Sequence, residues 1–313
     1  MIHRTVGGIA AILLLLASCG ESTVPQASPE TPRPGSEFPV TIAAANGDVT
    51  LERRPERIVS LSPTATEMLF AIGAGEQVEA VDDQSNYPAD APVTDLSGFD
   101  PNVEAIASYE PDLVVYATEP GDLGASLEGL GIPALQQDAA ASLDDVYAQI
   151  DELGIATGNP SEAAELVEGM RGDIDTIVDA IETTEPPLSF YHELDDTYYS
   201  VTSSTFIGQL YARTGLVNIA DEAKGAGGGY PQLSAEYIIQ ANPDLIFLAD
   251  TKCCGQSAAT VAERPGWSRI AAVERGGVIS LDDDIASRWG PRVVDFLRRI
   301  AAAVEGVPEA NAP

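Results

Sequence analysis

Two stretches of the chain, 132 positions apart, have nearly the same sequence. Asn102 to Ala117 reads NVEAIASYEPDLVVYA and Ser234 to Ala249 reads SAEYIIQANPDLIFLA, with six of sixteen aligned positions identical. Each copy predicts a short helix with a carboxylate in its first turn, a Pro-Asp turn, and an apolar strand that suits burial on both faces. The duplication predicts two similar α/β lobes with a cleft between them. The alternative is that a common helix-to-strand junction occurs twice by chance.

The N-terminus carries the pattern of a secretory signal. A basic start precedes an apolar run from Val6 to about Ala17, which is shorter than the ~20 residues of a membrane-spanning helix. The run ends in Leu16-Ala17-Ser18-Cys19, which resembles the bacterial lipobox, where cleavage leaves the cysteine to be diacylated. We predict a signal peptide at 1–18, lipidation of Cys19, and an extracytoplasmic location anchored to the bacterial cell membrane. An ordinary signal peptide with an incidental cysteine is the alternative.

The rest of the chain divides by composition. Residues 19–37 are rich in proline, serine and threonine and hold too few apolar residues to pack, which predicts a disordered tether. The remaining body is long enough for one large or two medium domains. We place two lobes at 38–158 and 186–306, a bridging helix at 159–185 between them, and a tail at 307–313. No other segment is apolar enough to span a membrane.

Strands and helices alternate along the body, which is typical of parallel α/β sheets. Ser161 to Thr183 has the longest helical pattern, and Pro186-Pro187 ends it. Asn46-Gly47 between apolar stretches predicts a hairpin. The predicted strands are 58–61, 78–81, 113–116, 132–135, 188–192, 198–201 and 278–281. The other predicted helices are 63–72, 102–109, 121–130, 143–156, 205–213 and 291–304. The second copy of the repeat, Ser234 to Ala249, adds one more short helix and one more strand, which contains Leu245-Ile246-Phe247. The fold class is therefore α/β, with two Rossmann-like lobes of mainly parallel strands joined by one long helix, which permits only limited hinge motion.

The charge of the chain excludes some partners. The net charge is −33, and Lys224 and Lys252 are the only lysines. Such a surface repels nucleic acid and anionic lipid headgroups, so we expect no nucleic-acid partner and no membrane contact besides the lipid on Cys19. The charge could favour cationic ligands, or it could serve only to keep the surface solvated.

Two adjacent cysteines, Cys253 and Cys254, follow the second copy of the repeat. In an oxidising compartment they could form a vicinal disulfide, although such a ring strains the peptide between them. Two free thiols and a metal-binding pair are the alternatives. The sequence leaves these three states open.

Five motifs follow one another along the body. They are RIVSLSPTATEMLFAIG from Arg57, SNYP at Ser85–Pro88, LSGFDPNVEAI at Leu96–Ile106, GYPQLSAEYI at Gly229–Ile238 and RWGPR at Arg288–Arg292. In this order, over about residues 56–305, they resemble the extracytoplasmic solute-binding proteins of ABC importers for iron-siderophores and cobalamin, the vitamin B12-binding members among them. The resemblance implies a monomeric receptor without catalytic activity or a cofactor of its own. It would deliver a metal chelate to an ABC permease driven by a separate ATPase.

The family resemblance assigns a role to the first carboxylate of each repeat copy. In that family an acidic residue on each lobe docks onto arginines of the permease, which implies this role for Glu104 and Glu236. Equivalent helix starts put one carboxylate on each lobe, and two separated charges can set the orientation of docking. The alternative is that both residues only interact favourably with their helix dipoles.

The loops of the cleft supply the candidate ligand contacts. Flat conjugated ligands need apolar faces, and Arg288 could act as a polar clamp unless it pairs with Asp282, Asp283 or Asp284. His192 ends a predicted strand and could face the cleft or be a framework histidine. The aromatic candidates are Tyr87, Phe99, Tyr230 and Trp289.

The cleft loops are acidic, which bears on the ligand. They carry Asp82, Asp83 and Asp282 to Asp284 with few basic residues, whereas anionic ferric siderophores often need several arginines. We therefore expect a neutral or cationic chelate, such as cobalamin or a ferric hydroxamate siderophore. The loop of Phe99 is slightly shorter than in the cobalamin-binding members, and this leaves the identity of the chelate open.

Three other functions are less compatible with the sequence. A bare zinc or manganese receptor would need several histidines, and the mature chain has only His192, so no metal site is expected. A secreted α/β enzyme could use His192 as a base, but the chain has no G-x-S-x-G nucleophile elbow. It also has no P-loop, so the ATPase must be a separate chain. A lipid-anchored adhesion or structural module would not require the duplicated α/β pattern or the cleft aromatics.

Overall fold

Two four-stranded parallel sheets form the centres of the two lobes. The computed structural model describes residues 37–182 and 184–306, and these residues belong to one compact unit. The first sheet has the order β4-β3-β5-β6 and the second has the order β10-β9-β7-β8. The strands are β3 (Ile58–Leu61), β4 (Val78–Val81), β5 (Leu113–Tyr116), β6 (Ala134–Gln136), β7 (Ser189–Glu193), β8 (Val217–Asn218), β9 (Leu245–Leu248) and β10 (Val278–Ser280). Every neighbouring pair in these sheets is parallel, which confirms the predicted fold class.

The first lobe follows its sequence signals closely. Asn46 and Gly47 join the antiparallel strands β1 (Val40–Ala44) and β2 (Gly47–Leu51), with Gly47 at a φ of 108°. Ser62 caps the first helix by accepting a hydrogen bond from the backbone N–H of Ala65, and Pro63 occupies the first helical position. The helices are α1 (Pro63–Ala71), η1 (Gly75–Gln77), α2 (Val103–Ala107), α3 (Leu123–Gly129) and α4 (Leu143–Thr157).

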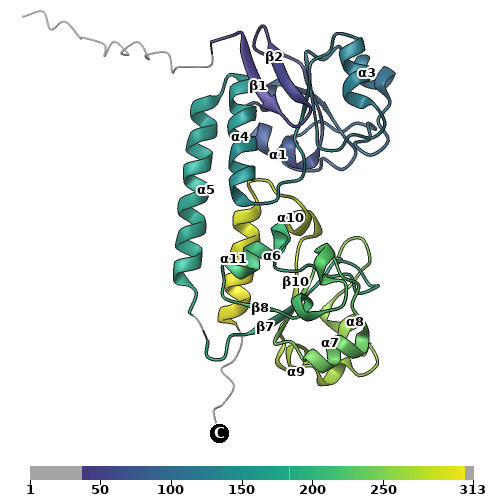
Figure 1. The fold of residues 1–313 in the computed structure, drawn as a ribbon, viewed down its shortest axis with the longest axis vertical. Helices are drawn as coiled ribbons and strands as arrows, with labels where there is room; N and C mark the ends of the chain where they lie inside the picture. Colours follow the sequence, from purple (N-terminus) through teal and green to yellow (C-terminus); the bar gives the residue numbers. More distant parts are fainter. Residues whose placement is uncertain (1–36, 183, 307–313) are drawn as a thin grey trace, which may run out of the picture. The chain divides into compact units, whose positions relative to one another are not determined.

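One long helix joins the two lobes. It is α5 (Pro160–Ala180), and it lies beside α4 and beside α11 (Val293–Glu305) (Figure 1). A single apolar cluster continues from β5 of the first sheet through Met170 and Ile174 of α5 to Phe190 and Phe247 of the second sheet. This shared core resists separation of the lobes along the helix. The domain boundaries at 158/159 and 185/186 stay a prediction.

The second lobe differs from the prediction in two places. Residues 198–201 do not form a strand: Ser200 donates its backbone N–H to Pro231 O, and only Tyr199 forms an isolated bridge, with Gln232. The segment therefore pairs with a loop rather than with the sheet, and the two-residue strand β8 takes the edge position. The sequence did not predict β8 or six short helices of this lobe, which are η2, η3, α8, η4, α9 and α10. The helices of this lobe are α6 (Phe206–Ala212), η2 (Ile219–Glu222), η3 (Ala226–Gly228), α7 (Ala235–Ala241), α8 (Ala258–Glu263), η4 (Trp267–Arg269), α9 (Ala271–Arg275), α10 (Asp283–Ser287) and α11.

The repeated Pro-Asp turn has the same structural role in both lobes. The Asp112 carboxylate accepts the backbone N–H groups of Glu56 and Arg57 at 2.9–3.1 Å, at the start of β3. The Asp244 carboxylate accepts the backbone N–H and the hydroxyl of Ser189 at 3.0 and 2.9 Å, at the start of β7. Each aspartate thus fixes the start of its own strand to the neighbouring parallel strand, which gives the repeat a physical explanation.

We predict that Asp112→Ala and Asp244→Ala each lower the free energy of unfolding. Hydrogen bonds to a charged acceptor contribute about 1.5–3 kcal/mol, and each substitution also leaves backbone donors at a strand start without their partner. Urea unfolding of the full chain measures the change. Asp151→Ala, an exposed carboxylate on α4, is the control and should change stability by less than about 0.5 kcal/mol. Equal effects at Asp112 and Asp151 would contradict the assignment.

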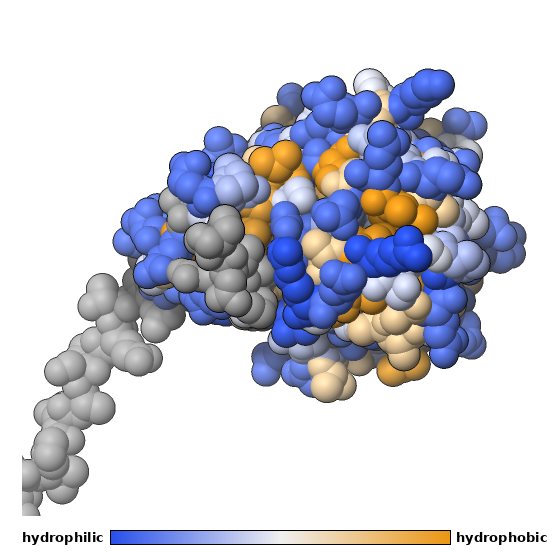
Figure 2. All heavy atoms as spheres, turned by 90° about the horizontal axis from the view of Figure 1, so that it is seen from below, coloured by the Kyte–Doolittle hydropathy of each residue, from blue (hydrophilic) through white to orange (hydrophobic). Residues whose placement is uncertain are grey.

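The surface is mainly hydrophilic on the face seen in Figure 2, where apolar side chains gather only in small separate patches. This agrees with the net charge of −33. Among residues 37–182 and 184–306, no helix combines the length and the hydropathy needed to cross a membrane. The predicted signal peptide, the lipidation at Cys19, the tether up to residue 36 and the tail at 307–313 lie outside the described residues.

Candidate functional site

A cavity of about 480 Å³ lies between the two lobes. Its wall in the first lobe comes from the ends of β3, β4, β5 and β6 and the segments that follow them, because the carboxyl ends of parallel strands meet at one edge of a sheet. The second lobe contributes only residues from α10 and the loop after it. The lining residues are Leu61, Ser62, Pro63, Thr64, Asp82, Gln84, Gly98, Phe99, Ala117, Thr118, Ala139, Asp284, Ser287, Arg288 and Trp289.

Three of the predicted ligand contacts meet in this cavity. They are Phe99 and Trp289, on opposite lobes, and Arg288. The Phe99 side chain is 76% exposed, so its ring is free to cover a ligand. Trp289 donates its indole N–H to Gln149 Oε1 at 3.1 Å, which fixes its orientation across the lobes. The contact of these residues with a ligand stays a prediction.

Arg288 is held by protein acceptors from both lobes. Its guanidinium donates to Glu67 Oε1 at 2.8 Å, to the carbonyl oxygen of Gln84 at 2.9 Å and to Asp284 Oδ1 at 3.0 Å. The side chain is only 9% exposed. The pair with Asp284 matches one alternative from the sequence, whereas the pair with Glu67 was not anticipated. The arginine is therefore held as a structural group of the cavity wall, with three of its five N–H donors already used.

Glu67 joins the lobes through a buried ion cluster, which we call the interlobe cluster and define as Glu67, Arg288 and Arg292. Glu67 is buried in α1, and it also accepts two hydrogen bonds from Arg292, at 2.9 Å from Nε and 2.5 Å from Nη2. The Arg292 guanidinium lies 4.3 Å from the ring centroid of Tyr87, which is 46% exposed. Tyr87 thus lines a neighbouring groove with Arg292 and not the interlobe cavity, and its contact with a ligand stays a prediction.

Asp82 adds a buried carboxylate to the cavity wall. One of its oxygens accepts the backbone N–H of Gln84 at 2.9 Å, and the other has no hydrogen-bond partner among the described residues. Burial raises the pKa of this carboxyl above its usual value. A Cβ at Gly98 would lie 2.6 Å from the carbonyl oxygen of Leu61, so only glycine fits beside Asp82 at this point of the wall.

Two predicted contacts do not reach the cavity. His192 is fully buried in β7, and its Nδ1 lies 2.9 Å from the Tyr211 hydroxyl. Burial lowers the pKa of His192 to about 3, so the ring is neutral. The framework alternative for His192 therefore fits the structure, because the strand is buried on both faces. Tyr230 is 53% exposed and is not part of the cavity wall.

The other predicted residues lie apart from the cavity. Glu104 and Glu236 are exposed in the first turns of α2 and α7, and neither has an ion-pair partner within residues 37–182 and 184–306. Cys253 and Cys254 are exposed free thiols in the loop after β9. No group of three or more metal-ligating side chains gathers in the part of the chain that the structure describes.

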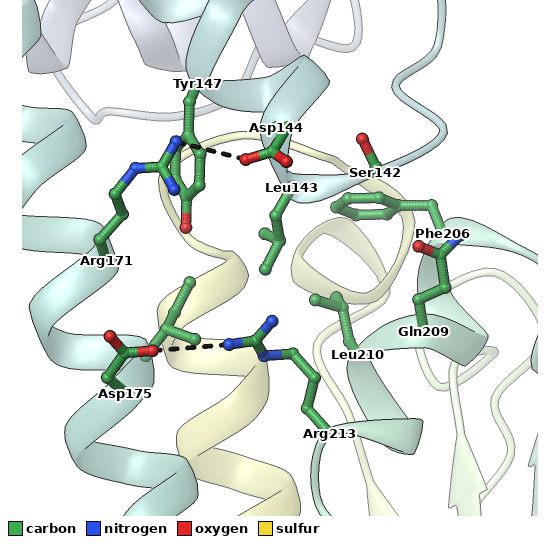
Figure 3. A pocket seen from close by; sticks show the side chains of 11 residues that line it. Ser142, Leu143, Asp144, Tyr147, Arg171, Asp175, Phe206, Gln209, Leu210 and Arg213 are labelled. Carbon is green, nitrogen blue, oxygen red and sulfur yellow. Dashed lines mark hydrogen bonds and ion pairs between the residues drawn. The ribbon is translucent and has the colours of Figure 1, made fainter.

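A second cavity, of about 340 Å³, lies where α4, α5 and α6 meet (Figure 3). Its charged groups pair with one another: Arg171 contacts Asp144 at 3.3 Å and Arg213 contacts Asp175 at 3.5 Å. The Arg171 guanidinium also lies 3.9 Å from the ring centroid of Tyr147. Its lining contains none of the predicted contacts and its arginines are already paired, so the interlobe cavity is the better candidate site.

Comparison with known proteins identifies the family. Residues 58–285 match the model of the periplasmic binding protein family. The chain is 32% identical over 311 residues to YvrC of Bacillus subtilis, an uncharacterised ABC transporter substrate-binding lipoprotein, covering 95% of this chain and 96% of YvrC. It is 31% identical over 319 residues to a cobalamin-binding protein of Halobacterium salinarum, covering 96% and 85% of the two chains.

A solved structure shares both the fold and part of the sequence. The crystal structure of a possible iron-binding periplasmic solute-binding protein from Staphylococcus epidermidis superposes with a TM-score of 0.70 at 25% identity. The match covers 80% of this chain and 99% of that protein. The family match covers most of the body, and the body has two lobes with parallel sheets and a cavity between them. The chain therefore belongs to the periplasmic binding protein family.

Proposed function

We propose that the chain is the lipid-anchored substrate-binding component of an ABC importer, and that it captures a metal chelate of the cobalamin type for delivery to the permease. The observation that carries this proposal is the interlobe cavity, with Phe99 and Trp289 as apolar surfaces and Asp82 and Asp284 as acidic groups. The named functions of the Bacillus and Halobacterium relatives support the importer and the cobalamin ligand. The lipobox supports the anchor at Cys19. The family consists of binding proteins, so the enzyme alternative with His192 is not retained.

The charge of the cavity favours a neutral or cationic chelate. Arg288 is the one basic residue of its wall, and this arginine already donates to Glu67, Gln84 and Asp284. An anionic ligand would face the carboxylates of Asp82 and Asp284 without a free cation to neutralise it, and like charges at an interface disfavour binding. A neutral ligand would not meet this repulsion.

Fluorescence titration of the full chain tests this proposal. We expect saturable quenching of tryptophan emission by cyanocobalamin at sub-micromolar concentration, weaker binding of a ferric hydroxamate, and no saturable response to an anionic ferric catecholate. Trp289→Phe should remove most of the quenching because Trp289 lines the cavity, whereas Trp267→Phe should not, because Trp267 is buried in the second lobe. Free N-acetyltryptophanamide corrects for light absorbed by the ligands. A folded sample that responds to none of the three would contradict chelate uptake.

A ferric hydroxamate siderophore is the second candidate ligand. The Staphylococcus epidermidis neighbour, which is named as iron-binding, favours it. The same titration decides between the two, since the tighter ligand names the class.

We further propose that Glu104 and Glu236 dock onto basic residues of the permease. One exposed carboxylate in an equivalent helix turn of each lobe supports a two-point contact. The double variant Glu104→Lys/Glu236→Lys should reduce uptake of labelled cyanocobalamin on the order of tenfold in cells where it replaces the wild type, because each lobe then presents a repulsive charge. Binding of cyanocobalamin to the purified variant should not change.

The matched control for docking reverses two other exposed glutamates, one on each lobe. Glu128→Lys/Glu274→Lys, in α3 and α9, makes the same change in net charge away from the predicted docking positions. If both double variants reduce uptake equally, the effect comes from net charge and the docking assignment fails.

A further inference from the structure

The loop after β9 binds a carboxylate with consecutive backbone groups. We call residues 250–256 the Cys-Cys loop. The Asp283 carboxylate accepts the backbone N–H of Thr251 at 2.9 Å, of Lys252 at 2.8 Å and of Cys253 at 3.0 Å. It also accepts the Thr251 hydroxyl at 2.7 Å. Four hydrogen bonds from three consecutive residues therefore hold a single side chain.

The bound carboxylate positions a wall of the interlobe cavity. Asp283 is the first residue of α10, and the next residues of this helix, Asp284 and Ser287, line the cavity. The Lys252 ammonium adds contacts to Asp282 at 2.8 Å and to Asp284 at 2.7 Å. Through these contacts the Cys-Cys loop holds α10 in the place where Asp284 meets Arg288.

The two cysteines lie at the end of this binding loop. Both cysteines are free thiols and exposed. The chain turns between β9 and the cysteines, where the backbone N–H of Cys254 donates to the carbonyl oxygen of Asp250 at 3.3 Å. These two adjacent thiols lie next to the backbone groups that hold Asp283, and they belong neither to the cavity wall nor to the predicted docking residues.

We propose that Cys253 and Cys254 form a modification site, at which a small-molecule or protein disulfide converts the dithiol to a vicinal disulfide, and that this conversion releases Asp283 and loosens α10. The reaction is a thiol–disulfide exchange in two steps. One cysteine thiolate attacks the reagent disulfide and displaces its first thiolate. The second cysteine thiolate attacks the resulting mixed disulfide at the protein sulfur and displaces the second. The two protons lost by the cysteines pass to the two released thiolates.

Ring closure must change the backbone that holds Asp283. Neighbouring Cα atoms are ~3.8 Å apart across a trans peptide, whereas disulfide-linked residues usually have Cα atoms ~4.4–6.8 Å apart, so a vicinal bridge distorts the peptide between its cysteines. That peptide carries the N–H that Cys254 donates to Asp250. The adjoining peptide carries the N–H that Cys253 donates to Asp283. Distortion at this point weakens both contacts and frees the start of α10.

Oxidation of the full chain with excess glutathione disulfide tests the proposal without any ligand. We expect the peptide that contains both cysteines to lose two hydrogens in mass, and the loss to be reversed by dithiothreitol. Amide hydrogen exchange within residues 282–288 should become about tenfold faster in the oxidised protein, as expected for local opening of a loosened segment. Exchange in α4 serves as the internal reference and should not change.

Two variants distinguish the effect of the vicinal disulfide from nonspecific oxidation of the protein. Cys254→Ser cannot form the bridge, so its exchange at 282–288 should not respond to the oxidant. Asp283→Asn weakens the carboxylate contact directly and should give fast exchange at 282–288 even when reduced. The proposal is overturned if the two cysteines stay reduced in the folded protein, if they oxidise without faster exchange at 282–288, or if Cys254→Ser responds like the wild type. These readouts do not depend on cyanocobalamin, so they can succeed or fail separately from the proposed ligand.

Discussion

Replacing Glu67 with alanine is expected to lower the free energy of unfolding by about 3–5 kcal/mol, because it leaves two buried arginines without their shared partner. Glu67 is the only carboxylate of the first lobe within hydrogen-bonding distance of Arg288 and Arg292 in the described residues, and it accepts from both. The three side chains are at most 15% exposed, so water cannot replace the lost acceptor. Urea unfolding of the full chain at pH 7 measures the change.

A second ion pair, between α11 and α5, provides the control. Arg298 of α11 contacts Asp173 of α5 at 2.6 Å, but both side chains are about half exposed. Asp173→Ala should therefore cost no more than about 1 kcal/mol. The triple variant Glu67→Leu/Arg288→Met/Arg292→Met removes all the buried charges together and should recover most of the stability lost in Glu67→Ala. A cost below 1 kcal/mol for Glu67→Ala would show that the interlobe cluster does not hold the lobes together.

Replacing Asp250 with asparagine is expected to stabilise the protein, and to do so by more at pH 8 than at pH 5. Burial, and then the charge of the neighbouring Glu193, raise the pKa of Asp250 from 3.8 to about 7. Glu193 is itself fully buried and bound by Arg264 at 2.5 and 2.6 Å. At pH 8 the wild type must therefore keep a second negative charge beside Glu193, whereas asparagine is neutral at every pH.

Proton binding determines how the stability changes with pH. Asp250 has a higher pKa in the folded protein than in the unfolded chain, so folding binds a proton between about pH 4 and pH 7. The stability that this bound proton contributes is fully present below about pH 4, and it is lost as the pH rises through about 7. The difference in unfolding free energy between the wild type and Asp250→Asn should thus change by about 2–3 kcal/mol from pH 5 to pH 8. Urea unfolding at both values measures it.

An exposed aspartate is the control for this titration. Asp151→Asn removes a carboxylate from the solvent-facing side of α4 and should leave the pH dependence of the wild type unchanged. If Asp250→Asn shows the same pH dependence as the wild type, Asp250 is already ionised at pH 5 in the folded state.

The sequence predicted those features that depend on local patterns. The hairpin at Asn46-Gly47, the cap at Ser62 and most strands of both sheets have short-range signals in turn residues and apolar runs. The convergence of Phe99 with Arg288 and Trp289 could also be predicted, because loops at the carboxyl edge of parallel sheets meet in one cleft.

Features that depend on tertiary contacts were predicted less well. Residues 198–201 have the apolar character of a strand, but their backbone pairs with a loop, and no pattern within the segment distinguishes the two partners. His192 lies on a strand buried on both faces, where alternation cannot show which side chains reach a cleft. Glu67 was not singled out, although one signal was present: it is a lone carboxylate inside a helix whose neighbours from Thr64 to Leu69 are all buried. Its partners are more than 220 positions away, beyond the reach of local patterns.

The way the second lobe reaches the cavity has a consequence for how such a receptor diversifies. Its cavity-lining residues all fall within 284–289. Hydrogen bonds join this short segment to the first lobe, in the pairs Asn86–Asp284, Gln84–Arg288 and Gln149–Trp289. Residues 189–281, which carry Glu236, contribute nothing to the wall of the described cavity. Ligand recognition and half of the proposed docking surface are therefore inherited on separate pieces of chain. Recombination between relatives at the β10–α10 junction could exchange a transporter partner while the choice of cargo is kept.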